Sequence, residues 1–262
     1  MSCRRLARWL VSVALVAAPP SAFAQATAKP AAVRSQRAPA APKLKVMYNQ
    51  YQSPVMSLFI ADADGSNEHP LLSSPGLDYS PSYSADGKWI AFSSDRDTKP
   101  AAYPGSWEQM QSTGIYIVAP DGSGLRRLTH KNGVAGSPAW SPKGDEIALS
   151  VRRYFRRPGP PPGQIALMKS DGSDFRVIVD DSMNNGFASW SPDGSTLVFK
   201  RGHQLVTMSL ADRKIVPLTD GKYYDNFPQW SPKGGAIRIH VLAAPPASAA
   251  PHSWCSATSL PS

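Results

Sequence analysis

The stretch Trp190-Ser-Pro-Asp-Gly194, WSPDG, decides the fold because near-copies of it recur along the chain. The same turn reads YSADG at 83–87 and WSPKG at 140–144 and 230–234. Proline presets φ for the first central position of a tight turn, and glycine accepts the positive φ that closes it. We therefore expect four equivalent turns, each after an aromatic residue. The residues that mark them are Tyr83, Gly87, Trp140, Gly144, Trp190, Gly194, Trp230 and Gly234.

A second type of turn recurs between the turns of the first type, and its copies follow one another at nearly the same spacing. It reads ADADGS at 61–66, APDGSG at 119–124, KSDGSD at 169–174 and SLADRK at 209–214. Apolar residues alternate between the turns, as in KWIAF at 88–92, which is typical of half-buried β-strands. A repeat of about 40 residues with variable insertions is typical of propellers. The sequence predicts an all-β fold, a β-propeller with about four four-stranded repeats over residues 44–240.

The aromatic residue before each turn has two interpretations. Four equivalent aromatic residues suit four equivalent contacts between sheets, so we expect each one to wedge between neighbouring sheets. The alternative is a set of aromatic side chains that stack on a ligand. Repetition in every unit favours the structural role.

Two segments carry a resemblance to a known family: SPSYSADGKWIAFSSDRD at 80–97 and GIYIVAPDGSGLRRLTH at 114–130. They resemble the TolB-like, WD-like propeller repeats of exported bacterial proteins, and the likeness runs over roughly 46–237. The resemblance implies a six-bladed ring, a role in protein–protein contacts and a link to the Tol–Pal cell-envelope system with a lipoprotein partner. No residue of that contact carries over, because the shared motif is structural. Similar blades occur in some serine peptidases and in a group of pectin-degrading lyases.

The chain departs from a six-bladed pattern at both ends of the repeat region. It opens with segments that match the second to fourth strands of a unit, continues with three full units and closes with a first and a partial second strand. Four complete sheets therefore require the last part to join the opening one. No acidic residue follows Asp225. These features suggest the hypothesis that the chain is a truncated or frame-shifted form of a longer propeller, or a non-functional remnant.

The ends of the chain are not expected to belong to the propeller. Residues 1–24 combine basic residues, the apolar run LVSVALVAA and the small-x-small sequence Ala22-Phe23-Ala24, the layout of a secretory signal peptide cleaved after Ala24. We expect a periplasmic or secreted protein with no membrane span after cleavage. The Ala- and Pro-rich stretch 25–43 and the tail 241–262 lack periodicity and are expected to be disordered.

The net charge and the cysteine content exclude few classes of function. The formal net charge of +9 falls to +6 once the three arginines of the signal peptide are removed, and the excess is spread along the chain. It indicates only a weak preference for acidic partners. Cys255 is the one cysteine beyond the signal peptide, so an internal disulfide is not expected.

The sequence has few motifs that are typical of catalytic or metal-binding sites. The chain has no G-x-S-x-G sequence, which the related peptidases would need. The alternating aspartates of 61–66 lack the later acidic ligand of a helix-flanked calcium site, so a plain hairpin turn is favoured. The histidines do not stand at metal-ligand spacing; they are His69, His130, His203, His240 and His252. We therefore assign no catalytic, metal or cofactor-binding residue and expect no cofactor.

Two insertions distinguish the chain from its own repeat. Residues 97–113 lengthen the second unit and bring Tyr103 and Trp107, and residues 151–163 lengthen the third. The latter gathers Arg152, Arg153, Tyr154, Phe155, Arg156 and Arg157. Arginine and aromatic residues are enriched at the energetic centres of protein interfaces. Both insertions follow the second strand of a unit, so both should emerge on one face as partner-binding loops. The alternative is a pair of solvated, mobile loops.

The sequence leaves two classes of function open. The favoured one is a non-enzymatic protein–protein interaction module in the cell envelope. The alternative is a propeller enzyme, a lyase or hydrolase that acts on acidic polysaccharide with histidine and arginine residues converging in the channel. Arginine beside aromatic residues also suits single-stranded nucleic acid, but export and the dispersed charge argue against that partner.

Overall fold

The computed structural model describes residues 45–52, 55–74, 76–97, 113–130, 133–152 and 162–242. These residues form strands and turns and contain no helix. The strands are β1 (Lys45–Gln52), β2 (Val55–Asp62), β3 (His69–Pro70), β4 (Asp78–Tyr83), β5 (Ile90–Ser94), β6 (Gly114–Val118), β7 (Arg126–Arg127), β8 (Ala135–Trp140), β9 (Glu146–Val151), β10 (Gln164–Lys169), β11 (Arg176–Val179), β12 (Asn185–Trp190), β13 (Thr196–Arg201), β14 (Gln204–Ser209), β15 (Ile215–Pro217), β16 (Tyr224–Trp230) and β17 (Ile237–Leu242).

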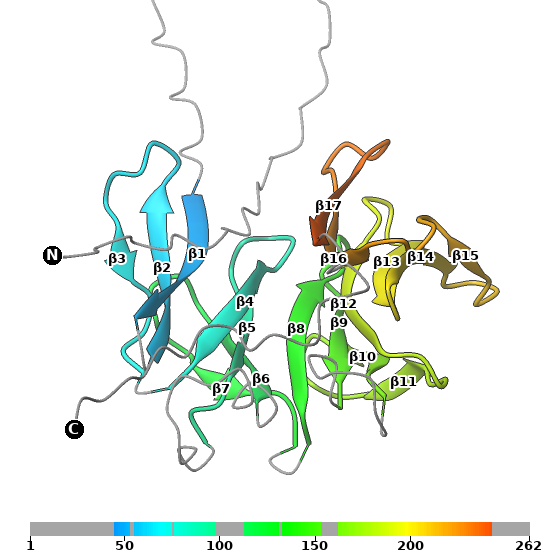
Figure 1. Ribbon diagram of the computed structural model, residues 1–262. Helices are drawn as coiled ribbons and strands as arrows, with labels where there is room; N and C mark the ends of the chain where they lie inside the picture. Colours follow the sequence, from blue (N-terminus) through cyan, green and yellow to red (C-terminus); the bar gives the residue numbers. More distant parts are fainter. Residues whose placement is uncertain are drawn as a thin grey trace, which may run out of the picture.

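The strands form five antiparallel sheets that follow one another along the chain (Figure 1). The second, third and fourth sheets have the orders β4-β5-β6-β7, β8-β9-β10-β11 and β12-β13-β14-β15. The first sheet is β1-β2-β3 and the last is β16-β17. The predicted all-β propeller repeat is confirmed, with three complete four-stranded sheets and two partial ones.

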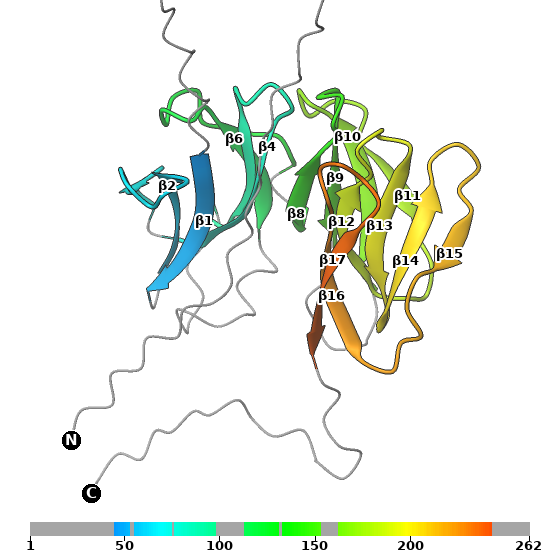
Figure 2. The same ribbon diagram turned by 90° about the horizontal axis from the view of Figure 1, so that it is seen from above.

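The two partial sheets do not complete each other. The Asp-Gly turn joins β2 to β3, so β1 to β3 correspond to the second to fourth strands of the later sheets, whereas β16 and β17 correspond to the first and second. Among the described residues β1 pairs only with β2, and β16 pairs with β17. Figure 2 shows the two partial sheets apart, at the two ends of the series. The pairing of first and last strands that would give a fourth complete sheet is therefore not formed.

The predicted ends fall mostly outside the described residues. This holds for the signal peptide of 1–24, the linker of 25–43 and most of the tail of 241–262. β17 continues to Leu242, two residues past the predicted boundary at 240. Val241 pairs with Asp225 and Leu242 with Tyr224, so the ladder to β16 carries the strand past the end of the repeat pattern.

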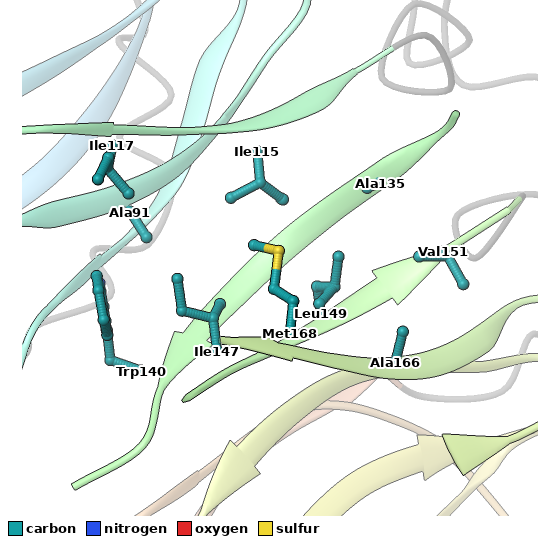
Figure 3. Close-up of a cluster of buried hydrophobic side chains, with 10 residues drawn as sticks. All are labelled: Ala91, Ile115, Ile117, Ala135, Trp140, Ile147, Leu149, Val151, Ala166 and Met168. Carbon is teal, nitrogen blue, oxygen red and sulfur yellow. The ribbon is translucent and has the colours of Figure 1, made fainter. Parts of the chain in front are cut away.

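The apolar core lies between the sheets. One cluster joins Ala91, Ile115 and Ile117 of the second sheet to side chains of the third, among them Leu149 and Met168 (Figure 3). β5 and β6 are buried at every position, although the alternating pattern predicts half-buried strands. The reason is that a neighbouring sheet covers each face, so the small residues of the pattern are buried as well as the large ones.

The aromatic residues before the repeated turns lie at these contacts between sheets. Trp140 is 8% exposed and packs in the cluster between the second and third sheets, and Trp190 is 7% exposed in the cluster between the third and fourth. The indole Nε1 of Trp190 donates a hydrogen bond to the Ala139 carbonyl oxygen at 2.9 Å. Tyr83 in β4 and Trp230 in β16, at the contacts that involve a partial sheet, are only half-buried. The four aromatic residues are dispersed over successive sheet contacts instead of gathering at one place.

The repeated turns close through local hydrogen bonds. In each aromatic-led turn the glycine has a positive φ, +71° at Gly194, and its N–H donates to the carbonyl oxygen of the serine after the aromatic residue. The Ser191 hydroxyl donates to Asp193 at 2.5 Å and, with the N–H and hydroxyl of Ser195, holds the pKa of Asp193 at about 2. In the Asp-Gly turns Asp64, Asp121 and Asp171 accept from the serine two residues on. These carboxylates serve the turns themselves.

Serine hydroxyls on the second strand of one sheet accept hydrogen bonds from the first, innermost strand of the next sheet. Ser93 in β5 accepts from the Ser137 N–H of the next sheet at 2.9 Å, and Ser150 in β9 accepts from the Phe187 N–H at 2.9 Å. Ser137 and Phe187 both have a positive φ where a register shift bends the innermost strand, and Phe227 in β16 repeats this conformation. In the register of the fourth sheet, Lys200 of β13 occupies the position that Ser93 of β5 and Ser150 of β9 occupy in the second and third sheets. Lys200 is half-buried, and burial lowers the pKa of its amine.

Lys200→Ser is expected to raise the free energy of unfolding by about 1 kcal/mol. The hydroxyl would offer β16 the acceptor that the earlier sheets offer, and the variant removes a cation whose charged form burial disfavours. Because the folded-state pKa of Lys200 is lowered, the wild type gains stability as pH rises toward 10.5, and the advantage of the variant should shrink there. Urea unfolding at pH 7 and pH 10 measures both effects. Lys169→Ser at an exposed site is the control; an equal gain in both variants would contradict the role of Lys200.

Candidate interaction face

The two insertions leave the propeller from adjacent points. The first ends at Thr113 and the second begins at Val151. The Thr113 hydroxyl donates to the Ala135 carbonyl oxygen at 2.9 Å, and the Ala135 N–H donates to the Thr113 carbonyl oxygen at 2.9 Å. Ala135 also pairs with Val151 across β8 and β9. One residue of β8 therefore joins the described end of the first insertion to the described beginning of the second.

The far end of the second insertion is tied to the fourth sheet. The Gly163 N–H donates to the Asn184 side-chain oxygen at 2.9 Å, and the Asn185 N–H donates to the Gly163 carbonyl oxygen at 3.0 Å. The Gly202 N–H, in the tight turn between β13 and β14, donates to the Asn184 carbonyl oxygen at 3.0 Å. Asn184 thus links the base of the insertion to the corresponding turn of the next sheet.

The beginning of the first insertion is held by a polar cluster on the second sheet. The Tyr116 hydroxyl donates to Asp97 at 2.6 Å, and the Arg127 guanidinium lies 3.3 Å from the same carboxylate oxygen. Burial, together with the bond to Asp97, raises the pKa of Tyr116 to about 12. Arg96 lies over the rings of Phe92 and Tyr116, with its carbon Cζ 5.2 and 5.1 Å from their centroids. The segment before the insertion is therefore fixed by several contacts that the sequence pattern does not reveal.

Each described arginine at this face has an acidic partner. The pairs are Arg96 with Asp78 at 2.8 Å, Arg127 with Asp97 at 3.3 Å, Arg152 with Asp180 at 3.6 Å and Arg201 with Asp181 at 2.9 Å. In the sequence, the insertion at 151–163 adds further arginines and no acidic residue. The excess of positive charge in this part of the sequence therefore comes from the insertion and not from the strands that flank it.

Most of the predicted partner-binding residues fall outside the described residues. This holds for Arg153, Tyr154, Phe155, Arg156, Arg157, Tyr103 and Trp107. Arg152 is described: its φ is +62°, its N–H donates to the Val134 carbonyl oxygen at 3.0 Å, and its side chain is 44% exposed. Sequence reasoning missed Asn184 and Asp97 as supports of the loops, since neither belongs to a repeated turn.

The described residues do not gather a metal site. They include no group of three or more histidine, cysteine, aspartate or glutamate side chains able to hold an ion. His203 lies against Tyr224 with ring centroids 4.0 Å apart, and His240 lies edge-on to Phe227 at 5.9 Å. His69 contacts the Asn67 carbonyl oxygen at 2.7 Å. Within the described part of the chain, no helix is long and apolar enough to cross a membrane.

Sequence comparison finds relatives that the chain matches over part of their length. An uncharacterized protein of Agrobacterium fabrum is 30% identical over 154 residues, which are 56% of this chain and 47% of that protein. The Tol-Pal system protein TolB of Francisella tularensis subsp. mediasiatica is 26% identical over 228 residues, with 69% of this chain and 49% of that protein covered. The chain spans about half the length of these curated relatives. No family model matches it.

Solved structures share the fold. TolB from Acinetobacter baumannii matches with a TM-score of 0.58 and 21% identity over 78% of this chain and 48% of that one. A putative TolB from Agrobacterium tumefaciens matches with a TM-score of 0.58 and 19% identity over 76% and 71%. Together with the repeated turns, the antiparallel sheets and the aromatic residues between them, these matches show that the chain is a β-propeller repeat protein similar to TolB.

Proposed function

We propose that this protein is an exported, non-enzymatic protein–protein interaction module, and that its partner binds the face that carries the two insertions. The observation that supports the proposal is the set of hydrogen bonds around Ala135 and Asn184, which ties the described ends of the two insertions to neighbouring strands. Loops on a rigid scaffold are where binding residues concentrate. The cationic and aromatic composition of the insertions supplies the residue types that interfaces use.

The relatives support a cell-envelope role of this kind. The curated matches from Francisella tularensis bear the name Tol-Pal system protein, and we infer that this chain contacts a periplasmic protein, such as an envelope lipoprotein, in a related system. The basic and apolar layout of residues 1–24 supports export by a signal peptide. We propose no enzymatic step; the described residues gather no group of three or more histidine, cysteine, aspartate or glutamate side chains that could hold a metal ion.

Reversing the charge of Arg153, Arg156 and Arg157 to glutamate is expected to abolish partner capture from an envelope extract of the native organism. The physical reason is that these residues carry the charge excess of the insertion, and glutamates in their place would face the acidic groups of the partner, where like charges brought together cost several kcal/mol. The measurement is affinity capture followed by mass spectrometry, with far-UV circular dichroism as the folding check.

A matched control reverses three exposed lysines elsewhere on the propeller. Lys233 lies in an aromatic-led turn, Lys169 lies at the end of β10 and Lys214 lies in the turn before β15, at the end of the sheets opposite the insertions. This triple variant has the same change in net charge and should keep the partner. Loss of the partner in both variants would show a dependence on overall charge, and retention in both would remove the insertion from the interface.

A further inference from the structure

A depression of about 360 Å³ lies between the second and third sheets, at the end opposite the insertions. Trp89, Ile117 and Trp140 supply its apolar lining. Arg126 and Lys143 supply cationic groups at its border. The depression thus combines aromatic surface with positive charge, away from the proposed partner face.

The next sheet shows what the guanidinium at this position ordinarily contacts. Arg176 follows the Asp-Gly turn of the third sheet as Arg126 follows that of the second. Arg176 forms ion pairs with Glu146 and, at 2.9 Å, with Asp174. The third sheet therefore satisfies its arginine with two carboxylates of its own.

Both carboxylates are replaced in the second sheet. Trp89 stands where Glu146 stands, since the carbonyl oxygen of each accepts from the serine that begins its turn, Ser84 or Ser141, at 2.8 Å. Gly124 stands where Asp174 stands, and both have a positive φ, +66° and +53°. Arg126 therefore meets a tryptophan and a glycine at the positions from which Glu146 and Asp174 reach Arg176.

The two replacements fit each other. A Cβ atom on Gly124 would lie 3.0 Å from two ring carbons of Trp89, so a side chain there would displace the indole. The glycine lets Trp89 lie across the turn beside Arg126, whose Cζ is 6.0 Å from the ring centroid. The other contact of Arg126 is the Asp171 carbonyl oxygen at 3.5 Å, and among the described residues no carboxylate forms an ion pair with it.

The carboxylates that border the depression are engaged in their own turns. Asp86 accepts from the Ser84 hydroxyl at 2.7 Å and pairs with Lys88 at 3.2 Å. Asp171 accepts from the Ser173 N–H at 2.8 Å and hydroxyl at 2.6 Å. These hydrogen bonds lower the pKa of both groups, which are therefore ionised acceptors committed to the turns. The guanidinium of Arg126 remains available to an anion from outside.

We propose that this depression binds an acidic side chain of a partner polypeptide. The carboxylate of that side chain pairs with Arg126 as the carboxylate of Glu146 pairs with Arg176. A guanidinium matches a carboxylate through two parallel hydrogen bonds. An apolar residue next to the acidic one packs against Trp89, as small sites combine an apolar lining with few polar groups. This second binding site goes beyond the proposed function and does not depend on the insertion face.

The test compares two peptides with uncharged ends that differ only in the central side chain, a carboxylate in one and an amide in the other. Acetyl-Leu-Glu-Leu-amide and acetyl-Leu-Gln-Leu-amide are titrated into the full protein, and the indole N–H signals are followed by nuclear magnetic resonance, with Trp89→Phe assigning the Trp89 signal. The glutamate peptide is expected to shift the Trp89 signal and to bind about tenfold more tightly than the glutamine peptide, because only the former carries the carboxylate. Equal affinities, or no shift with either peptide, would overturn the proposal.

Two arginine variants separate this site from general charge attraction. Arg126→Gln is expected to weaken binding of the glutamate peptide about tenfold, whereas Arg176→Gln, with the same change in net charge, should leave it within about twofold. Trp89→Glu places the missing carboxylate within the chain and should weaken binding as Arg126→Gln does. Equal losses in Arg126→Gln and Arg176→Gln would refute a specific site. Because the probe is a defined peptide, these outcomes are independent of partner capture by the insertion face.

Discussion

Trp190→Ala is expected to lower the free energy of unfolding by about 3–5 kcal/mol. The side chain is 7% exposed and packs in the apolar cluster between the third and fourth sheets, so its removal opens a cavity at a contact that holds two sheets together. The variant also removes the hydrogen bond that the indole N–H donates to the Ala139 carbonyl oxygen at 2.9 Å. Urea unfolding followed by far-UV circular dichroism measures the loss without depending on tryptophan emission.

Phe175→Ala is the matched control for this prediction. Phe175 is also a large aromatic residue, but it is 51% exposed, so its replacement should change the stability by no more than about 0.5 kcal/mol. A small effect of Trp190→Ala, similar to that of the control, would show that the aromatic residues do not hold neighbouring sheets together. The structural interpretation of the repeated turns would then be wrong.

Asp78→Ala is also expected to cost about 3–5 kcal/mol. Asp78 is fully buried at the beginning of β4, and the side chain of its partner Arg96 is 14% exposed. Removal of the carboxylate leaves a nearly buried guanidinium without its counter-charge at 2.8 Å. Arg96 keeps the Ser94 hydroxyl at 2.9 Å and the two aromatic rings beneath it, and these contacts do not neutralise its charge.

Two further variants show whether burial causes this cost. Asp180→Ala breaks the ion pair with Arg152, whose side chains are 58% and 44% exposed, and should cost less than about 1 kcal/mol. The double variant Asp78→Ala with Arg96→Met should be more stable than Asp78→Ala alone, because neither member of the buried pair is left charged without the other. Equal losses for Asp78→Ala and Asp180→Ala would contradict the claim that burial makes the Asp78–Arg96 ion pair costly to break.

The candidate sites differ in how far the sequence alone could lead to them. Composition singled out the insertion at 151–163 as a partner-binding loop, and nothing in that reasoning required a structure. Asn184 and Asp97 could not be found in the same way, because their roles depend on neighbours from other sheets. The depression at Arg126 was equally hidden, since RRL at 126–128 reads as an ordinary part of the repeat.

The repeated turns by themselves determined the all-β fold, the order of the strands and the positions of the aromatic residues. This follows because proline, aspartate and glycine act on φ, ψ and hydrogen bonds within a few residues, which a sequence pattern records directly. Only the tertiary structure decided that β1 and β16 do not pair, that strands read as half-buried are buried on both faces, and that Arg126 lacks the carboxylates Arg176 has. Each of these depends on which sheet lies beside which, and contacts between residues distant in the chain leave no local pattern.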